Sequence, residues 1–246
     1  MLVLLPPSET KRDGGVEGSA LDLSALSYAS LTRERSAAIA ALTKLSRSVE
    51  ESTAALGLGP KQRFEIDRNR ALHSSPTMIA MDRFTGVLFE GLAPETLDAD
   101  AREWLARNVV VHSALFGLVG AGDAIPAYRL SHDSKLPGVA LRKHWAPAIS
   151  AALATHDGLV LDLRSEAYAN LGPAPAGSHY LRVVTDAPSG QKRALNHFNK
   201  KGKGEFVREL AQAGIDHVDV AGLIEWAASR DIRLAYGKPG ELELTV

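Results

Sequence analysis

The apolar residues of this chain fall into short continuous runs separated by longer segments with helical spacing. Residues 1–5 form one such run, which Pro6 and Pro7 end, as expected of a buried strand. The runs at 109–111 and 158–163 have the same character. Further strands are predicted at 77–92, where Gly86 interrupts the pattern, and at 180–185, 232–236 and 242–246.

Between these runs, apolar residues recur every three or four positions, as they do on the buried face of a helix. In residues 31–55 this stripe consists of Ile39, Leu42, Leu45 and Val49. Because strands and helices alternate, we predict an α/β fold with helices flanking a mixed β-sheet, in one domain of 246 residues. Other helices are predicted at 60–72, 94–107, 137–154 and 198–213.

A glycine turn separates the first two predicted helices. Gly57 and Gly59 allow backbone amides to approach a phosphate closely, and Pro60 can begin the second helix. Lys61 adds a positive charge at that point. Residues 33–72 therefore have the shape of a helix–hairpin–helix element. A plain connection between two helices, ended by a glycine cap, is the alternative.

Composition and charge narrow the classes of partner. The net charge is −1, so nucleic-acid binding requires a local basic patch. The chain has no cysteine, and its eight histidines show no paired ligand spacing, so we expect no metal site and no cofactor. No apolar run approaches the roughly 18–20 residues that cross a bilayer. We expect a cytoplasmic protein without membrane contact.

Polar residues follow the first strand directly. In open α/β sheets, ligands gather beyond the carboxyl ends of strands. Lys11 is therefore well placed to meet an anion, and Ser8 can donate a hydrogen bond or act as a nucleophile beside it. A capped turn with a solvated lysine is the alternative.

An arginine follows the glycine-rich segment 115–123. Arg129 can contact a phosphate or carboxylate through its guanidinium fork, while Tyr128 stacks or donates a hydrogen bond. An arginine that merely fastens a loop is the alternative reading.

The third buried strand also ends in polar residues. Ser165, Glu166 and Tyr168 occupy positions expected of residues in a cleft. Glu166 can serve as a general base, or it can simply cap the helix that follows.

A dense basic segment lies near the carboxyl end of the chain. Glycines alternate with lysines in residues 200–204, at the predicted start of a helix, where side chains and amides can both bind phosphate. A solvated basic face is the alternative. The segment carries Lys192, Arg193, Lys200, Lys201, Lys203 and Arg208 against a single acidic residue, Glu205.

Taken together, these stretches resemble the YaaA peroxide-stress protein family. That family's pattern of a short strand followed by Ser-Pro-Ala-Lys corresponds to Ser8–Lys11, and its Leu-Ser-Gly-Leu-Tyr-Gly…Pro-Tyr-Arg-Leu block resembles Ser113–Gly117 and Tyr128–Leu130. The resemblance covers nearly the whole chain. Its other matches, in the expected order, are Phe84–Gly86 with Gly91–Leu92, Trp145, Leu163–Tyr168 and Lys200–Lys201.

The chain also departs from that family pattern. Gly120-Ala121 replaces an Arg-Pro pair, and Ser131 stands where an acidic residue is usual. Phe89 and Phe116 replace tyrosines. A cleft that has lost these hydroxyls and charges suggests a different ligand.

The resemblance implies a single α/β domain with a positively charged cleft and a helix–hairpin–helix element. It also implies DNA binding and protection against hydrogen peroxide, with less free iron and less oxidative damage. We expect the anion to lie where Lys11, Arg129, Lys200 and Lys201 converge, with the Gly57–Gly59 hairpin as a second contact.

Three hypotheses follow. The first is a stress protein that binds the DNA phosphate backbone with little sequence preference. The second is an enzyme acting on a small phosphorylated or nucleotide-like metabolite, in which Ser8, Lys11, Glu166 and Tyr168 carry the chemistry. The third is an interaction protein that binds iron or a partner and performs no chemistry.

Overall fold

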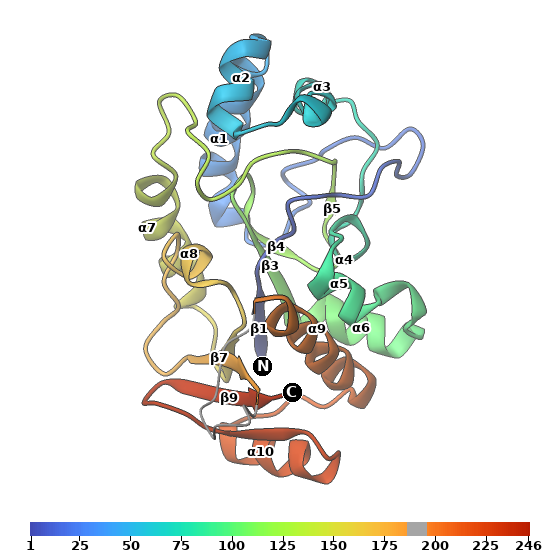
Figure 1. Cartoon of the computed structure of the whole chain (residues 1–246), viewed down its shortest axis with the longest axis vertical. Helices are drawn as coiled ribbons and strands as arrows, with labels where there is room; N and C mark the ends of the chain where they lie inside the picture. The colour runs from blue at the N-terminus through green and yellow to red at the C-terminus, as the bar shows by residue number, and fades with distance from the viewer. Residues whose placement is uncertain (186–195) are drawn as a thin grey trace.

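A mixed β-sheet of seven strands, with helices around it, forms the centre of the computed structural model, which describes residues 1–185 and 196–246 (Figure 1). The strand order is β4-β3-β1-β6-β7-β9-β8, with parallel pairs in the middle and antiparallel pairs at both edges. The predicted α/β architecture is therefore confirmed. The strands are β1 Leu2–Leu5, β3 Val109–Ser113, β4 Gly117–Gly120, β6 Val160–Asp162, β7 His179–Val184, β8 Arg233–Tyr236 and β9 Glu241–Thr245.

Strand β1 lies between β3 and β6 and is parallel to both. Val3 is in register with Val109, and Leu4 is in register with Asp162. The chain thus moves from β1 to one neighbour and later returns to the other side. At such a switch point the carboxyl ends of adjacent strands open toward a common region, which is where α/β proteins bind ligands.

Helices cover both faces and both ends of the sheet. In Figure 1, α7 and α8 lie on one side, α5, α6 and α9 on the other, and α1 to α3 at the end opposite α10. Within the described part of the chain, no helix is long and apolar enough to cross a membrane. The helices are α1 Thr32–Leu45, α2 Val49–Leu56, α3 Phe64–Arg70, α4 Ala80–Arg83, α5 Val87–Leu92, α6 Ala99–Asn108, α7 Leu141–Leu153, α8 Glu166–Ala169, α9 Asn196–Ala213 and α10 Val220–Ser229.

Two sequence predictions about the amino-terminal half are wrong. The stretch 31–55 is not one helix, because α1 ends at Leu45 and Ser48 caps a new helix by accepting a hydrogen bond from the Glu51 amide. The stretch 77–92 is not a strand. Only β2, Met78–Ile79, is extended, and it pairs with β5, Ala124–Ile125, before α4 and α5 begin.

Residues 80–92 form two short helices, α4 and α5, and Phe84 between them is extended and forms a bridge with Lys11. Met81, Phe84 and Leu88 in this stretch are buried. Within the glycine-rich segment, residues 117–120 form strand β4. Helix α10 has no counterpart among the predicted helices.

Glycines allow α5 and α9 to pack in direct backbone contact. A methyl group on Gly204 would lie 1.9 Å from the Leu88 carbonyl oxygen, and one on Gly91 would lie 2.6 Å from the Lys201 carbonyl oxygen. Gly202 faces the side chains of Val246 and Val183. The glycines of the basic segment therefore serve helix packing. They lie inside α9, which begins at Asn196, and not at its first turn.

We predict that Gly204→Ala lowers the free energy of unfolding by roughly 3 kcal/mol, because the added methyl forces α5 and α9 apart. Urea denaturation measures this loss. Gly222→Ala in α10 is the matched control, since its methyl would meet nothing closer than Asp219 Oδ1 at 3.4 Å. Equal stability of the two variants would contradict the packing role of Gly204.

Candidate functional site

Lys11 lies buried just beyond the carboxyl end of β1. Its ammonium group donates to the carbonyl oxygens of Ser8, at 2.8 Å, and Glu9, at 3.3 Å. It also lies 4.1 Å from the centre of the Tyr128 ring, a cation–π contact. Burial lowers the pKa of Lys11 to about 7. The Lys11 amine is thus bonded within this chain. The alternative reading of the sequence required an amine free in solvent.

Tyr128 connects this lysine to the end of β3. Its hydroxyl lies 2.6 Å from Ser113 Oγ, which also accepts hydrogen bonds from the amides of Leu115 and Phe116. Tyr128 is fully buried, and burial raises the pKa of its phenol. The phenol therefore stays protonated and acts as a neutral hydrogen-bonding group.

Arg129 is fixed at the mouth of the same region. Asn69 accepts from the Arg129 amide at 2.8 Å and donates to its carbonyl at 2.9 Å. The guanidinium forms an ion pair with Glu9, 2.5 Å between Nη2 and Oε2, and Ser131 Oγ donates to the other carboxylate oxygen at 2.7 Å. The charged end of Arg129 therefore contacts a carboxylate of this chain, a contact that fits either sequence reading of this arginine.

The end of β6 carries a buried ion pair. Asp162 accepts from Arg164 through both carboxylate oxygens, at 2.8 and 2.6 Å. Arg164 in turn donates to His112 Nδ1 at 2.9 Å and to the Gly172 carbonyl at 2.8 Å. Burial and the adjacent guanidinium hold the pKa of His112 well below its ordinary value. His112 is consequently neutral, with its proton on Nε2.

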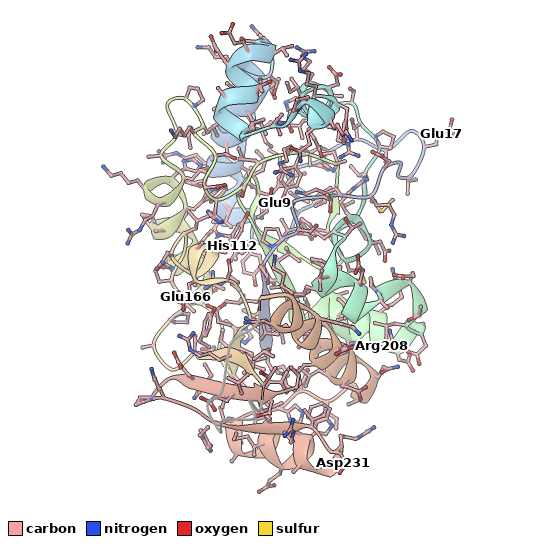
Figure 2. The ribbon with its side chains drawn as sticks, in the orientation of Figure 1. Glu9, Glu17, His112, Glu166, Arg208 and Asp231 are labelled. Carbon is pink, nitrogen blue, oxygen red and sulfur yellow. The ribbon has the colours of Figure 1, made fainter. Side chains whose placement is uncertain are left out.

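Tyr168 of α8 lies between the polar ends of the strands. Its ring packs edge-on against His112 and His132, with centroids 5.6 and 5.3 Å apart. Burial raises the pKa of Tyr168, although hydrogen bonds with Ser131 and the His132 backbone act in the opposite direction. Ser165 begins α8 and accepts from the Tyr168 amide, so its role here is a helix cap. Figure 2 shows Glu9 and His112 in the middle of the molecule.

A second buried lysine lies at the start of β7. Lys203 of α9 donates to the Leu163 carbonyl at 3.0 Å and sits 5.2 Å from the centre of the Tyr180 ring. Burial lowers the pKa of Lys203 to about 8. Beside it is a hollow of about 320 Å³, lined by Glu166, Ala169, Asn170, Tyr180 and Arg182.

Two further residues predicted to contact the anion lie on α9. Lys200 and Lys201 are exposed on α9, Lys201 is 3.4 Å from Glu205, and neither contacts Lys11 or Arg129 in the described part of the chain. Lys192 and Arg193 lie outside the described residues.

The glycine turn joins α2 to α3 at one end of the molecule (Figure 1). Gly57 ends α2 in the left-handed conformation, at φ 61°, and Gly59 precedes a short 3₁₀ turn at Pro60–Gln62. Lys61 is exposed in that turn.

Several residues of the site escaped the sequence analysis. Glu9 and Asn69 contact Arg129, and Ser131 contacts Glu9. Asp162 and His112 contact Arg164. A signal existed for Asp162 and Arg164, because both occur where a buried strand ends. Within the described residues, no group of three His, Asp or Glu side chains is placed to hold a metal ion.

The fold and the polar strand ends define an α/β protein with its candidate site at a topological switch point. Residues 1–229 match the family model described as "Peroxide stress protein YaaA". A UPF0246 protein of Corynebacterium efficiens is 44% identical over 216 residues, covering 86% of this chain and 85% of the relative. A UPF0246 protein of Streptomyces coelicolor is 40% identical over 240 residues, covering 94% and 90%. The chain therefore belongs to the YaaA peroxide stress protein family.

We predict that Lys203→Met changes how stability depends on pH. The pKa of this amine is about 8 in the folded protein and near 10.5 when unfolded. Between these values the unfolded chain binds a proton that the folded chain does not, so the lysine's unfavourable contribution shrinks as pH rises. The free energy of unfolding of the wild type minus that of the variant should rise by about 1.4 kcal/mol per pH unit.

Urea denaturation at several pH values between about 8 and 10 measures this difference. Lys201→Met, which removes an exposed lysine from the same helix, should give a difference that stays flat. A flat difference for Lys203→Met as well would show that its amine is not buried.

Proposed function

We propose that this protein acts in the peroxide-stress response by binding the phosphate backbone of DNA, thereby limiting iron-driven oxidative damage. The observation that carries the proposal is a pair of exposed cations, Lys61 and Arg63, beside the glycine turn between α2 and α3. No ion pair engages either side chain within the described residues. Phosphate contacts of this kind supply most non-specific DNA affinity.

The neighbouring charges strengthen this assignment to Lys61 and Arg63. Arg68 pairs with Glu65 and Asp13, and Arg70 pairs with Asp67, so these arginines are already neutralised within the chain. The turn itself has the glycines and the helix start expected of a helix–hairpin–helix contact. Exposed Lys200 and Lys201 on α9 offer a further basic surface for the same duplex or a second one.

We predict that Lys61→Ala with Arg63→Ala weakens binding to a short duplex and reduces the slope of log affinity against log salt by about 1.8, since each lost phosphate contact removes about 0.9. Fluorescence anisotropy at several salt concentrations measures both quantities. Lys200→Ala with Lys201→Ala, tested in parallel, reports on the contribution of α9.

The matched control is Arg230→Ala with Lys238→Ala, which removes two exposed cations near α10 and β8, at the other end of the molecule (Figure 1). This control should leave affinity and slope unchanged. An equal loss of affinity in the control and in the Lys61/Arg63 variant would show that net charge alone attracts the duplex. It would contradict a defined contact at the turn.

A second candidate function is an enzyme acting on a small phosphorylated or nucleotide-like substrate. The observation in its favour is the gathering of Lys11, Tyr128, Tyr168 and His112 at the carboxyl ends of β1, β3 and β6, all buried and all with shifted pKa values. Such clusters of perturbed groups occur preferentially at functional sites. The hollow beside Glu166 is open to solvent, and none of these four side chains lines it.

For this second function, a thermal-shift screen against phosphorylated metabolites should find a compound that raises the Tm of the wild type but not of Lys11→Met. The methionine keeps the length of the side chain and removes its amine. A screen in which every compound that protects the wild type protects Lys11→Met equally would exclude Lys11 from the ligand site.

A further inference from the structure

We propose that Arg129 and Ser131 form a seat for the carboxylate or phosphate group of a small ligand, and that Glu9 occupies this seat as an internal stand-in until the ligand displaces it. The inference rests on the second candidate function, because it assigns a ligand class to the same strand ends. The inference adds that a side chain of the protein itself blocks the position of the ligand group.

The contacts of Glu9 are those of a bound carboxylate. One oxygen, Oε2, faces Arg129 Nη2 at 2.5 Å, and the other, Oε1, accepts from Ser131 Oγ at 2.7 Å. Each oxygen thus has its own donor, from two residues that follow β5. Arginine forks of this kind recognise carboxylates and phosphates alike.

The seat is preorganised, and it retains an unused donor. Both backbone groups of Arg129 are tied to the Asn69 side chain, and the arginine side chain is only 12% exposed. Arg129 Nε is buried and has no hydrogen-bond partner among the described residues. A buried N–H without an acceptor is unfavourable, so an incoming anion that also reached Nε would gain a contact that Glu9 does not make.

Glu9 can leave without disturbing the fold. Its side chain is 52% exposed, and an ion pair with so much solvent around it adds little net stability. The backbone around it is held separately, by Lys11 Nζ on the Ser8 and Glu9 carbonyls and by the Thr85 amide on Ser8 Oγ. Displacement therefore needs only rotation about the side-chain bonds of Glu9.

The surroundings favour an anion once Glu9 is gone. Glu9 is the carboxylate that pairs with Arg129, whose side chain is largely buried. The departure of Glu9 leaves the guanidinium without its carboxylate at the seat, with the Tyr168 phenol beside Ser131. The vacated seat would thus attract a carboxylate or phosphate more strongly than a neutral group.

The test is to titrate the wild type and Glu9→Gln with inorganic phosphate and with succinate, at constant ionic strength, by isothermal titration calorimetry. If the seat is free about one-tenth of the time in the wild type, removing the stand-in lowers the apparent Kd about tenfold. The anion with the larger gain identifies the ligand group. Equal Kd values for both anions in the two proteins would overturn the inference and leave the small-anion site itself standing.

Two variants show whether the gain in affinity arises at the seat formed by Arg129 and Ser131. Glu9→Gln with Arg129→Gln should lose the tenfold gain, whereas Glu17→Gln, which removes an exposed carboxylate at the margin of the molecule, should bind as the wild type does (Figure 2). Circular dichroism melts confirm that each variant is folded. A gain that persists without Arg129, or that Glu17→Gln reproduces, would reduce the effect to net charge and refute the seat.

Discussion

This structure depends on hydrogen bonds that buried cationic side chains donate to backbone carbonyls. A charged side chain is costly to bury unless hydrogen bonds replace its water. Here the replacement comes from carbonyls of segments far apart in the chain, as when Arg83 joins the carbonyls of Arg12, Pro76 and Ile125. These bonds fasten the long irregular segments onto the sheet. Arg35 and Lys203 act in the same way. Lys11 and Arg164 are also buried and bind carbonyls, but those of residues nearby in the chain, Ser8, Glu9 and Gly172.

The same bonds give the candidate site its chemical character. Lys11 and Lys203 are drawn into a region of low polarity, so their pKa values fall to about 7 and about 8. Burial, together with the Arg164 guanidinium that donates to Nδ1, lowers the pKa of His112 and keeps it neutral. The hydrogen bonds that hold the strand ends together thus also set the protonation states of the groups that a ligand would contact there. The exposed cations of the α2–α3 turn lie outside this network and remain available to a partner at the surface.

The sequence predicts those parts of the fold that depend on local pattern. The continuous apolar runs of β1 and β3 are strands because both of their faces are buried, and the polar residues that follow β1 and β6 lie at one edge of the sheet because these parallel strands end there. The pairing of Glu9 with Arg129 is not predictable in this way, since it joins residues 120 positions apart through side-chain geometry. The role of Gly204 is equally non-local. The alternation of glycine and lysine in residues 200–204 suggests phosphate binding, and only the packing of α5 against Gly204 shows that this glycine serves helix contact.

The most direct test of this account is the titration of Lys11 followed by NMR, with the side-chain amine labelled and Lys11→Met used to assign its signal. Burial against the Ser8 and Glu9 carbonyls predicts a midpoint at about 7. A midpoint at the ordinary lysine value of 10.5 would show that the amine is solvated. In that case the strand-end site as described here would not exist.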